Sequence, residues 1–146
     1  MKTFFQSCGV ILTLTAWAKF YSVNGSAGNL DLPDVLFGIP YHSLLLITGL
    51  LESAVVAFLL LSEDAVSKCA CLLWLTLNLV LYRVGMFFLR PGTPCPCLGN
   101  LTDAIHISPR TADYAMKAVL GYLLIGSCAT LLWLRRRAKV RPHHEL

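Results

Sequence analysis

The chain has 146 residues, of which 56% are hydrophobic and only 14% are charged. A water-soluble globular protein needs more polar surface than this, so the composition excludes that class and indicates a membrane protein. The net charge of +4 does not indicate a nucleic-acid partner, because much of the positive charge lies in one run after a hydrophobic segment, without a groove-reading motif.

Four apolar runs reach or approach the ~20 residues that cross a hydrocarbon core. They lie at 4–20, 43–61, 69–89 and 114–134. We therefore predict an all-α, integral membrane four-helix bundle, a single transmembrane domain over residues 1–146 that contacts membrane lipid. The first run also fits a secretory signal, because Ala16-Trp17-Ala18 has the pattern of a small-x-small cleavage site, and both readings stay open.

The distribution of Lys and Arg predicts the orientation of these runs. The N-terminus, the 62–68 loop and the basic tail at 135–146 hold seven Lys and Arg residues, the 21–40 loop holds none, and the 90–111 loop holds two. Because basic segments resist translocation, we predict a multi-pass protein of the cytoplasmic (inner) membrane with both termini in the cytoplasm. The 90–111 loop is then extracytoplasmic.

Two ionisable residues lie within the first and second runs. Lys19 is close to the outer end of the first run, where it can lift its ammonium to the interface. Glu52 is near the middle of the second, where an ionisable group costs a few kcal/mol on insertion scales unless it faces protein or water. On a helix Glu52 shares a face with Tyr41, Thr48 and Gly49, and Gly49 allows another helix to approach closely.

The third run adds polar residues on two neighbouring faces. Asn78 and Tyr82 form one stripe, and Arg83 falls beside it. Counting residues from the outer face puts Glu52 ~16 Å deep and Arg83 ~10 Å deep, which predicts a buried Glu52–Arg83 pair. Lys19 starts nearer the surface and is the weaker candidate partner of Glu52. For Arg83 two readings stay open: a packed structural ion pair, or a polar pocket that binds a quinone headgroup or passes protons.

The six cysteines divide by location. Cys8 and Cys128 are most simply small apolar fillers of helix packing. Cys69 and Cys71 would point about 200° apart on a helix, so they cannot form a local disulfide while helical.

Cys95 and Cys97 differ in kind, because Pro94 and Pro96 exclude a helix around them. A disulfide closed over one intervening residue departs from relaxed geometry, and strained bridges exchange readily. The extracytoplasmic side of a bacterial membrane also permits disulfides. Two alternatives stay open, a structural bridge and a Cu(I) site with His106 as a further ligand, whereas the spacing does not fit structural zinc.

Three segments together resemble the methylamine-utilisation MauE family, a member of a wider DoxX-like group: Ala16-Trp17-Ala18-Lys19-Phe20, the central Glu52, and Cys95-Pro96-Cys97-Leu98-Gly99. The resemblance extends from about Trp17 to Leu134. It implies a four-helix membrane protein that works beside a thioredoxin-like partner in disulfide formation during maturation of a periplasmic enzyme. Cys95 and Cys97 match the family's cysteine segment, while Leu98 stands where an aromatic residue is expected.

The sequence therefore predicts a membrane component of an extracytoplasmic thiol–disulfide redox pathway, with Cys95 and Cys97 as the reactive pair and a thioredoxin-like protein as the partner. No metal is expected, and a quinone is a candidate electron acceptor. The competing hypothesis is a non-enzymatic membrane scaffold or assembly factor with a structural loop disulfide. If the redox hypothesis holds, the candidate site also includes the polar side chains inside the predicted spans. These are Lys19, Glu52, Asn78 and Arg83.

Overall fold

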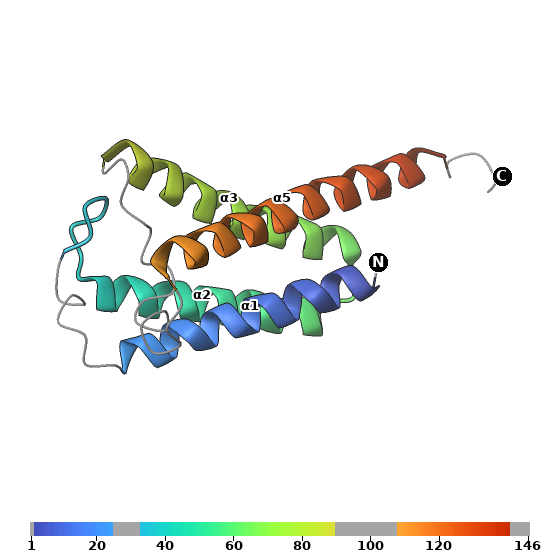
Figure 1. The fold of residues 1–146 in the computed structure, drawn as a ribbon. Coiled ribbons are helices and arrows are strands. Elements are labelled where there is room, and N and C mark those ends of the chain that lie inside the picture. The colour runs from blue at the N-terminus through green and yellow to red at the C-terminus, as the bar shows by residue number, and fades with distance from the viewer. Residues whose placement is uncertain (1, 25–32, 90–107, 141–146) are drawn as a thin grey trace.

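The computed structural model describes residues 2–24, 33–89 and 108–140, and these form four long helices (Figure 1). They are α1 (Lys2–Val23), α2 (Tyr41–Leu61), α3 (Ala65–Leu89) and α5 (Pro109–Val140). Within the described residues, α2, α3 and the 110–137 part of α5 are long and apolar enough to cross a membrane. The all-α architecture is confirmed, and the three apolar helices agree with a bundle embedded in lipid.

Polar caps set the helix starts and explain why two helices are longer than the apolar runs predicted. The Asp64 carboxylate accepts hydrogen bonds from the backbone N–H of Val66 at 3.2 Å and of Ser67 at 3.0 Å, so α3 begins at Ala65. The Ser108 hydroxyl accepts the N–H of Thr111 at 3.2 Å in the same way. Hydropathy alone does not detect such polar first turns. The apolar run at 114–134 is therefore shorter than α5 and begins after α5 does.

The four helices pack as two pairs. α1 lies along α2 and α3 lies along α5, whereas contacts between the pairs are fewer (Figure 1). Gly49 brings α2 close to α1, because a Cβ at this position would lie 3.3 Å from the Phe20 ring. The predicted role of Gly49 as a site of close helix approach is confirmed.

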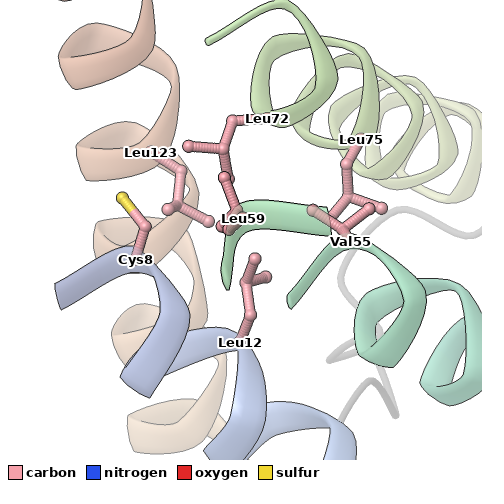
Figure 2. Close-up of a cluster of buried hydrophobic side chains, with 7 residues drawn as sticks. All are labelled: Cys8, Leu12, Val55, Leu59, Leu72, Leu75 and Leu123. Atoms are coloured by element: carbon pink, nitrogen blue, oxygen red, sulfur yellow. The ribbon is translucent and has the colours of Figure 1, made fainter. Parts of the chain in front are cut away.

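Buried apolar side chains from all four helices meet where the two pairs touch (Figure 2). Large apolar side chains also cover the outside, where Leu61 is 83% and Phe88 is 77% exposed. In water such a surface would be unstable, and in a bilayer it is the lipid contact. The core residues are Cys8, Leu12, Val55, Leu59, Leu72, Leu75 and Leu123.

A compact turn at residues 33–40 leads into α2 and rests on α3. Asp34 is 1% exposed, and its carboxylate accepts the N–H of Leu36 and of Phe37, each at 3.1 Å. Gly38 adopts a φ of +67°, a left-handed conformation that glycine accommodates without strain. The Tyr82 hydroxyl of α3 donates to Asp34 at 2.9 Å, which fastens the 33–40 turn to that helix.

Candidate functional site

Cys95, Cys97 and His106 lie outside the residues that the structure describes. The chain on either side of that segment is described: α3 ends at Leu89 and α5 begins at Pro109. Both of these helix ends lie at the end of the bundle where α1 stops and α2 starts (Figure 1). We call this end of the bundle the thiol end.

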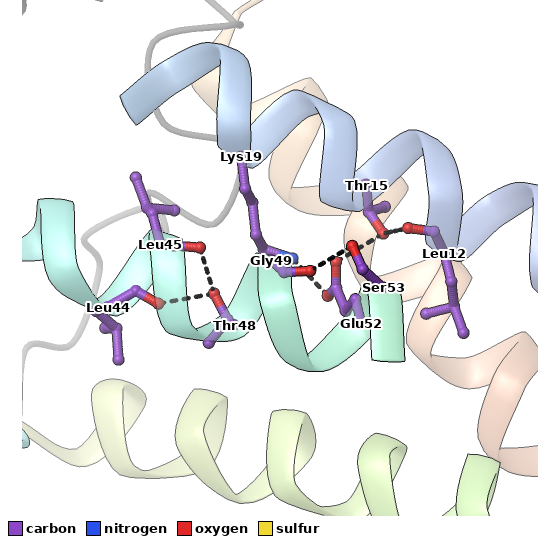
Figure 3. A network of polar contacts seen from close by, with 9 residues as sticks. All are labelled: Leu12, Thr15, Lys19, Leu44, Leu45, Thr48, Gly49, Glu52 and Ser53. Carbon is purple, nitrogen blue, oxygen red and sulfur yellow. Dashed lines mark hydrogen bonds and ion pairs between the residues drawn. The ribbon is translucent and has the colours of Figure 1, made fainter. Parts of the chain in front are cut away.

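A buried ion pair joins α1 to α2 (Figure 3). The Lys19 ammonium donates to Glu52 Oε1, and the two side chains are only 4% and 2% exposed. The Thr15 hydroxyl donates to the other carboxylate oxygen, Glu52 Oε2, at 3.1 Å. Both carboxylate oxygens are therefore satisfied, as burial of a charge requires.

Two sequence predictions about these charges are wrong. Lys19 does not lift its ammonium to the interface, and Glu52 pairs with Lys19 rather than with Arg83. The physical reason is the close α1–α2 contact at Gly49, where Lys19 Cβ lies 3.6 Å from a Cβ placed on the glycine. Counting residues along a helix gives only the depth of Glu52 in the membrane. Which cation the carboxylate contacts depends on the helix that packs beside it.

Arg83 pairs instead with Asp113, on the first turns of α5. The same carboxylate accepts the Lys117 ammonium at 2.6 Å, one helical turn further on. The Arg83 Nη1 nitrogen is buried and has no hydrogen-bond partner among the described residues. The guanidinium is thus held on one side by Asp113, while a donor on its other side remains unused.

A pocket lies between the two helix pairs, with a cavity volume of about 50 Å³. Its charged side chains are Lys19, Glu52 and Arg83, and Tyr82 and Thr48 add hydroxyls. The predicted polar face of α2 is confirmed, since most of it lines this pocket. The apolar part of the wall consists of Leu44, Leu45, Leu79, Met116 and Leu120.

Asn78 does not join this group. It is exposed on α3, and its Nδ2 donates to the Trp74 carbonyl at 2.7 Å, within its own helix. The stripe predicted for Asn78 and Tyr82 therefore does not form one site, because only Tyr82 turns toward the 33–40 turn and the pocket.

The cysteines inside the helices have structural environments. Cys8 is fully buried in the core, which confirms its role as a filler. Cys128 is exposed on α5, so the filler role predicted for it is wrong. Cys69 is buried and Cys71 is half-buried on α3.

Sequence reasoning missed Asp113 and Asp34, the carboxylates that position Arg83 and Tyr82. The sequence contains a local pattern that could have identified each carboxylate. Asp113 lies four residues before Lys117 at the start of a capped helix, and Asp34 follows a proline and precedes Gly38 in a turn.

The site thus combines one buried ion pair, Lys19–Glu52, and one half-buried pair, Arg83–Asp113, with a mainly apolar pocket between the helix pairs. The arrangement places charged side chains from three helices beside a small cavity in the interior of the bundle. In comparisons with protein-family models, with curated proteins and with solved structures, the chain has no match.

Proposed function

We propose that the chain is a membrane component of an extracytoplasmic thiol–disulfide redox pathway of the inner membrane, and that Cys95 and Cys97 exchange with a thioredoxin-like protein. The carrying observation is the pair itself: two cysteines one residue apart, flanked and separated by prolines, between two long helices. The resemblance to the MauE family supports the same role. The three apolar helices support placement in a membrane.

The chemistry is a reversible exchange in two steps. A thiolate of the partner attacks one sulfur of the Cys95–Cys97 bridge, which forms a mixed disulfide and releases the other cysteine as a thiolate. The partner's second thiolate then attacks the mixed disulfide. The partner gains a disulfide, and Cys95 and Cys97 together gain the two electrons and two protons that the partner loses.

Trapping of the mixed disulfide tests this proposal. Cys97→Ser and Cys95→Ser, made separately, each leave one reactive thiol, and at least one should accumulate a reducible adduct with a thioredoxin-like protein on non-reducing gels. Cys128→Ser is the control, because Cys128 is an exposed cysteine of α5 that is not part of the pair. If neither variant forms an adduct, or if the double Cys→Ser protein oxidises its partner normally at wild-type abundance, the redox function is wrong.

The proposed orientation has a separate test. Both termini are in the cytoplasm in this proposal, because the basic residues of the tail lie in the last turns of α5 and directly after it. An alkaline phosphatase domain fused after Leu146 should be inactive, and a fluorescent protein at the same position should fluoresce. An active phosphatase would reverse the orientation and move Cys95 and Cys97 to the reducing side.

A further inference from the structure

We propose that the end of α5 binds the phosphate groups of anionic phospholipids, through three consecutive arginines at the end of the bundle opposite the thiol end. We call these residues the arginine cluster; they are Arg135, Arg136 and Arg137. The proposal does not rest on the redox function, because it involves neither the cysteine pair nor the pocket.

The length of α5 carries its end out of the hydrocarbon core. With 32 residues the helix is ~48 Å long, whereas the hydrocarbon core of a bilayer is ~30 Å thick. A Cβ on Gly126 would touch the Phe4 ring near the start of α1, and α5 continues from there to Val140, ~21 Å further. The end of α5 therefore projects beyond the start of α1 (Figure 1).

Trp133 marks the depth of the lipid headgroups on this helix. Its side chain is 41% exposed, and tryptophan prefers the boundary between hydrocarbon and headgroups. Leu132, just before it, is 57% exposed and suits contact with lipid chains. The arginine cluster follows within one helical turn of Trp133, so its guanidinium groups lie at the depth of the lipid phosphates.

The positive charge of the arginine cluster is not compensated within the described part of the chain. All three side chains are exposed, and the ion pairs between described residues involve other cations: Lys19, Arg83 and Lys117. Asp64, in the connection between α2 and α3 at the same end of the bundle, directs its carboxylate to the first turn of α3. Three like charges on adjacent residues repel one another, so a counter-anion stabilises this end of α5.

The stack of Arg137 on Trp133 orients one guanidinium for such an anion. The guanidinium carbon lies 3.8 Å from the centroid of the Trp133 ring, one helical turn earlier. Stacking on an indole occupies the face of the guanidinium plane, and the N–H groups at its edge still point outward as donors. Two parallel N–H groups match two oxygens of a phosphate. The stack thus joins a ring that lies among lipids to a donor for their headgroups.

Lysines from two other helices add positive charge at the same end of the bundle. Lys2, the first residue of α1, is exposed, and the Lys68 ammonium of α3 lies 5.6 Å from the centroid of the Phe5 ring. Because this charge directly follows apolar helix surface, lipid phosphates are already beside it in the membrane, whereas a soluble polyanion has to be recruited. An anionic phospholipid is therefore the favoured partner.

Quenching of Trp133 fluorescence by brominated lipids tests the proposal. The full-length protein with Trp17→Phe and Trp74→Phe keeps Trp133 as its one tryptophan. In lipid nanodiscs, brominated phosphatidylglycerol, which is anionic, should quench Trp133 in preference to brominated phosphatidylcholine, which is zwitterionic, by about fivefold in relative association constant. Both faces of a nanodisc carry the same lipids, so the orientation of the protein does not affect the result.

Changing all three arginines of the cluster to Gln should abolish this preference, and high salt should weaken it. Arg110→Gln, which removes an exposed arginine at the thiol end, should keep it. A second reporter protein keeps only Trp17, which is 68% exposed in α1 toward the thiol end. Its quenching should show no preference and should be the same with and without the arginine cluster, because the fold is unchanged.

Four results would overturn the proposal: equal quenching of Trp133 by the two lipids, an undiminished preference in the triple variant, the same preference at Trp17, or loss of the preference when inorganic phosphate is added at constant ionic strength. The last result would indicate a site for a soluble anion. If neither lipid quenches Trp133, the end of α5 is covered by protein, such as a second copy of the chain, and the proposal is equally wrong.

Discussion

The Lys19 ammonium and the Glu52 carboxylate form an ion pair that is almost fully withdrawn from solvent at the contact between α1 and α2. A pair in this environment stabilises the fold only while both members are present, because either charge alone would remain buried without compensation.

Removal of one member of that pair should therefore be much worse than removal of both. Glu52→Leu and Lys19→Met are each expected to lower the free energy of unfolding by about 3–5 kcal/mol, and the double variant Lys19→Met, Glu52→Leu by much less. Denaturant unfolding in detergent measures this. Lys117→Gln is the control for loss of a lysine at a site 60% exposed, where little change is expected. Additive losses would contradict the pairing.

The second prediction concerns which charges are coupled. Arg83→Gln and Asp113→Asn should show a large coupling free energy in a double-mutant cycle, because Asp113 is the carboxylate that holds the guanidinium. The crossed cycle, Arg83→Gln with Glu52→Gln, should show a markedly smaller one. A larger coupling in the crossed cycle would favour the Glu52–Arg83 pair that depth alone predicts.

The third prediction concerns the hydrogen bond between Tyr82 of α3 and Asp34 of the 33–40 turn. Tyr82→Phe keeps the ring stacked on Phe37 but removes the hydroxyl that donates to the buried Asp34 carboxylate. We expect a loss of about 1.5–3 kcal/mol and faster proteolysis within the turn, because a hydrogen bond to a charged group is lost. Tyr114→Phe, at a tyrosine 70% exposed, is the control. Equal protease sensitivity of the two variants would contradict the contact.

Two glycines of α5 provide a matched pair for helix packing. A Cβ at Gly126 would lie 2.3 Å from the Phe4 ring, whereas a Cβ at Gly121 meets nothing within 4 Å. Gly121→Ala should raise stability by about 0.5–1 kcal/mol through helix propensity. Gly126→Ala should be the less stable of the two, because the Phe4 ring must move away from Tyr122. Identical unfolding midpoints would show that α1 and α5 are not in close contact here.

The pH dependence of stability should include a contribution from Asp64, which lies between the apolar helices α2 and α3. The Ser67 hydroxyl, followed by the backbone N–H groups of Ser67 and Val66, lowers the pKa of this carboxyl below its ordinary 3.8. Because the folded pKa is the lower one, the stabilisation is complete above the ordinary value and is lost as the pH falls through the folded pKa.

Asp64→Asn should therefore flatten the acid limb of the unfolding midpoint plotted against pH. Glu63→Gln, at the exposed neighbouring position, removes the same charge without removing a helix cap and should leave that limb in place. An unchanged limb in Asp64→Asn would show that the carboxylate does not cap α3.

The sequence allowed the helices to be predicted and left their pairing open. Long apolar runs require helices in a membrane, since the backbone has no other source of hydrogen bonds there. The ends were less predictable, because caps such as Asp64 and Ser108 are polar and lie outside the apolar windows. The partner of Glu52 depends on which helix lies beside α2 at Gly49, and a single sequence does not contain that neighbour relationship.

For the same reason, the charged residues that line the pocket were predicted, but the contacts between them were not. Thr48 and Glu52 share a face by helical spacing alone, and that face lines the pocket. Asp113 lies one residue before the apolar run at 114–134, so hydropathy does not place the carboxylate that holds Arg83 on a span. Asn78 shows the opposite error: a polar residue inside a span satisfies its amide on its own backbone and turns outward.

The α1–α2 pair also has a consequence for the biogenesis of the protein. Among the described helices α1 is the one that does not rank as a span by itself, although its 22 residues are long enough, and it carries Lys19 in its last turns. During synthesis α1 emerges first, and its counter-charge arrives only when α2 has been translated as far as Glu52. We therefore expect the two helices to insert as one unit, in which the stable location of the first depends on the second. A defect at Glu52 would accordingly affect the insertion of α1 before it affected any reaction of the finished protein.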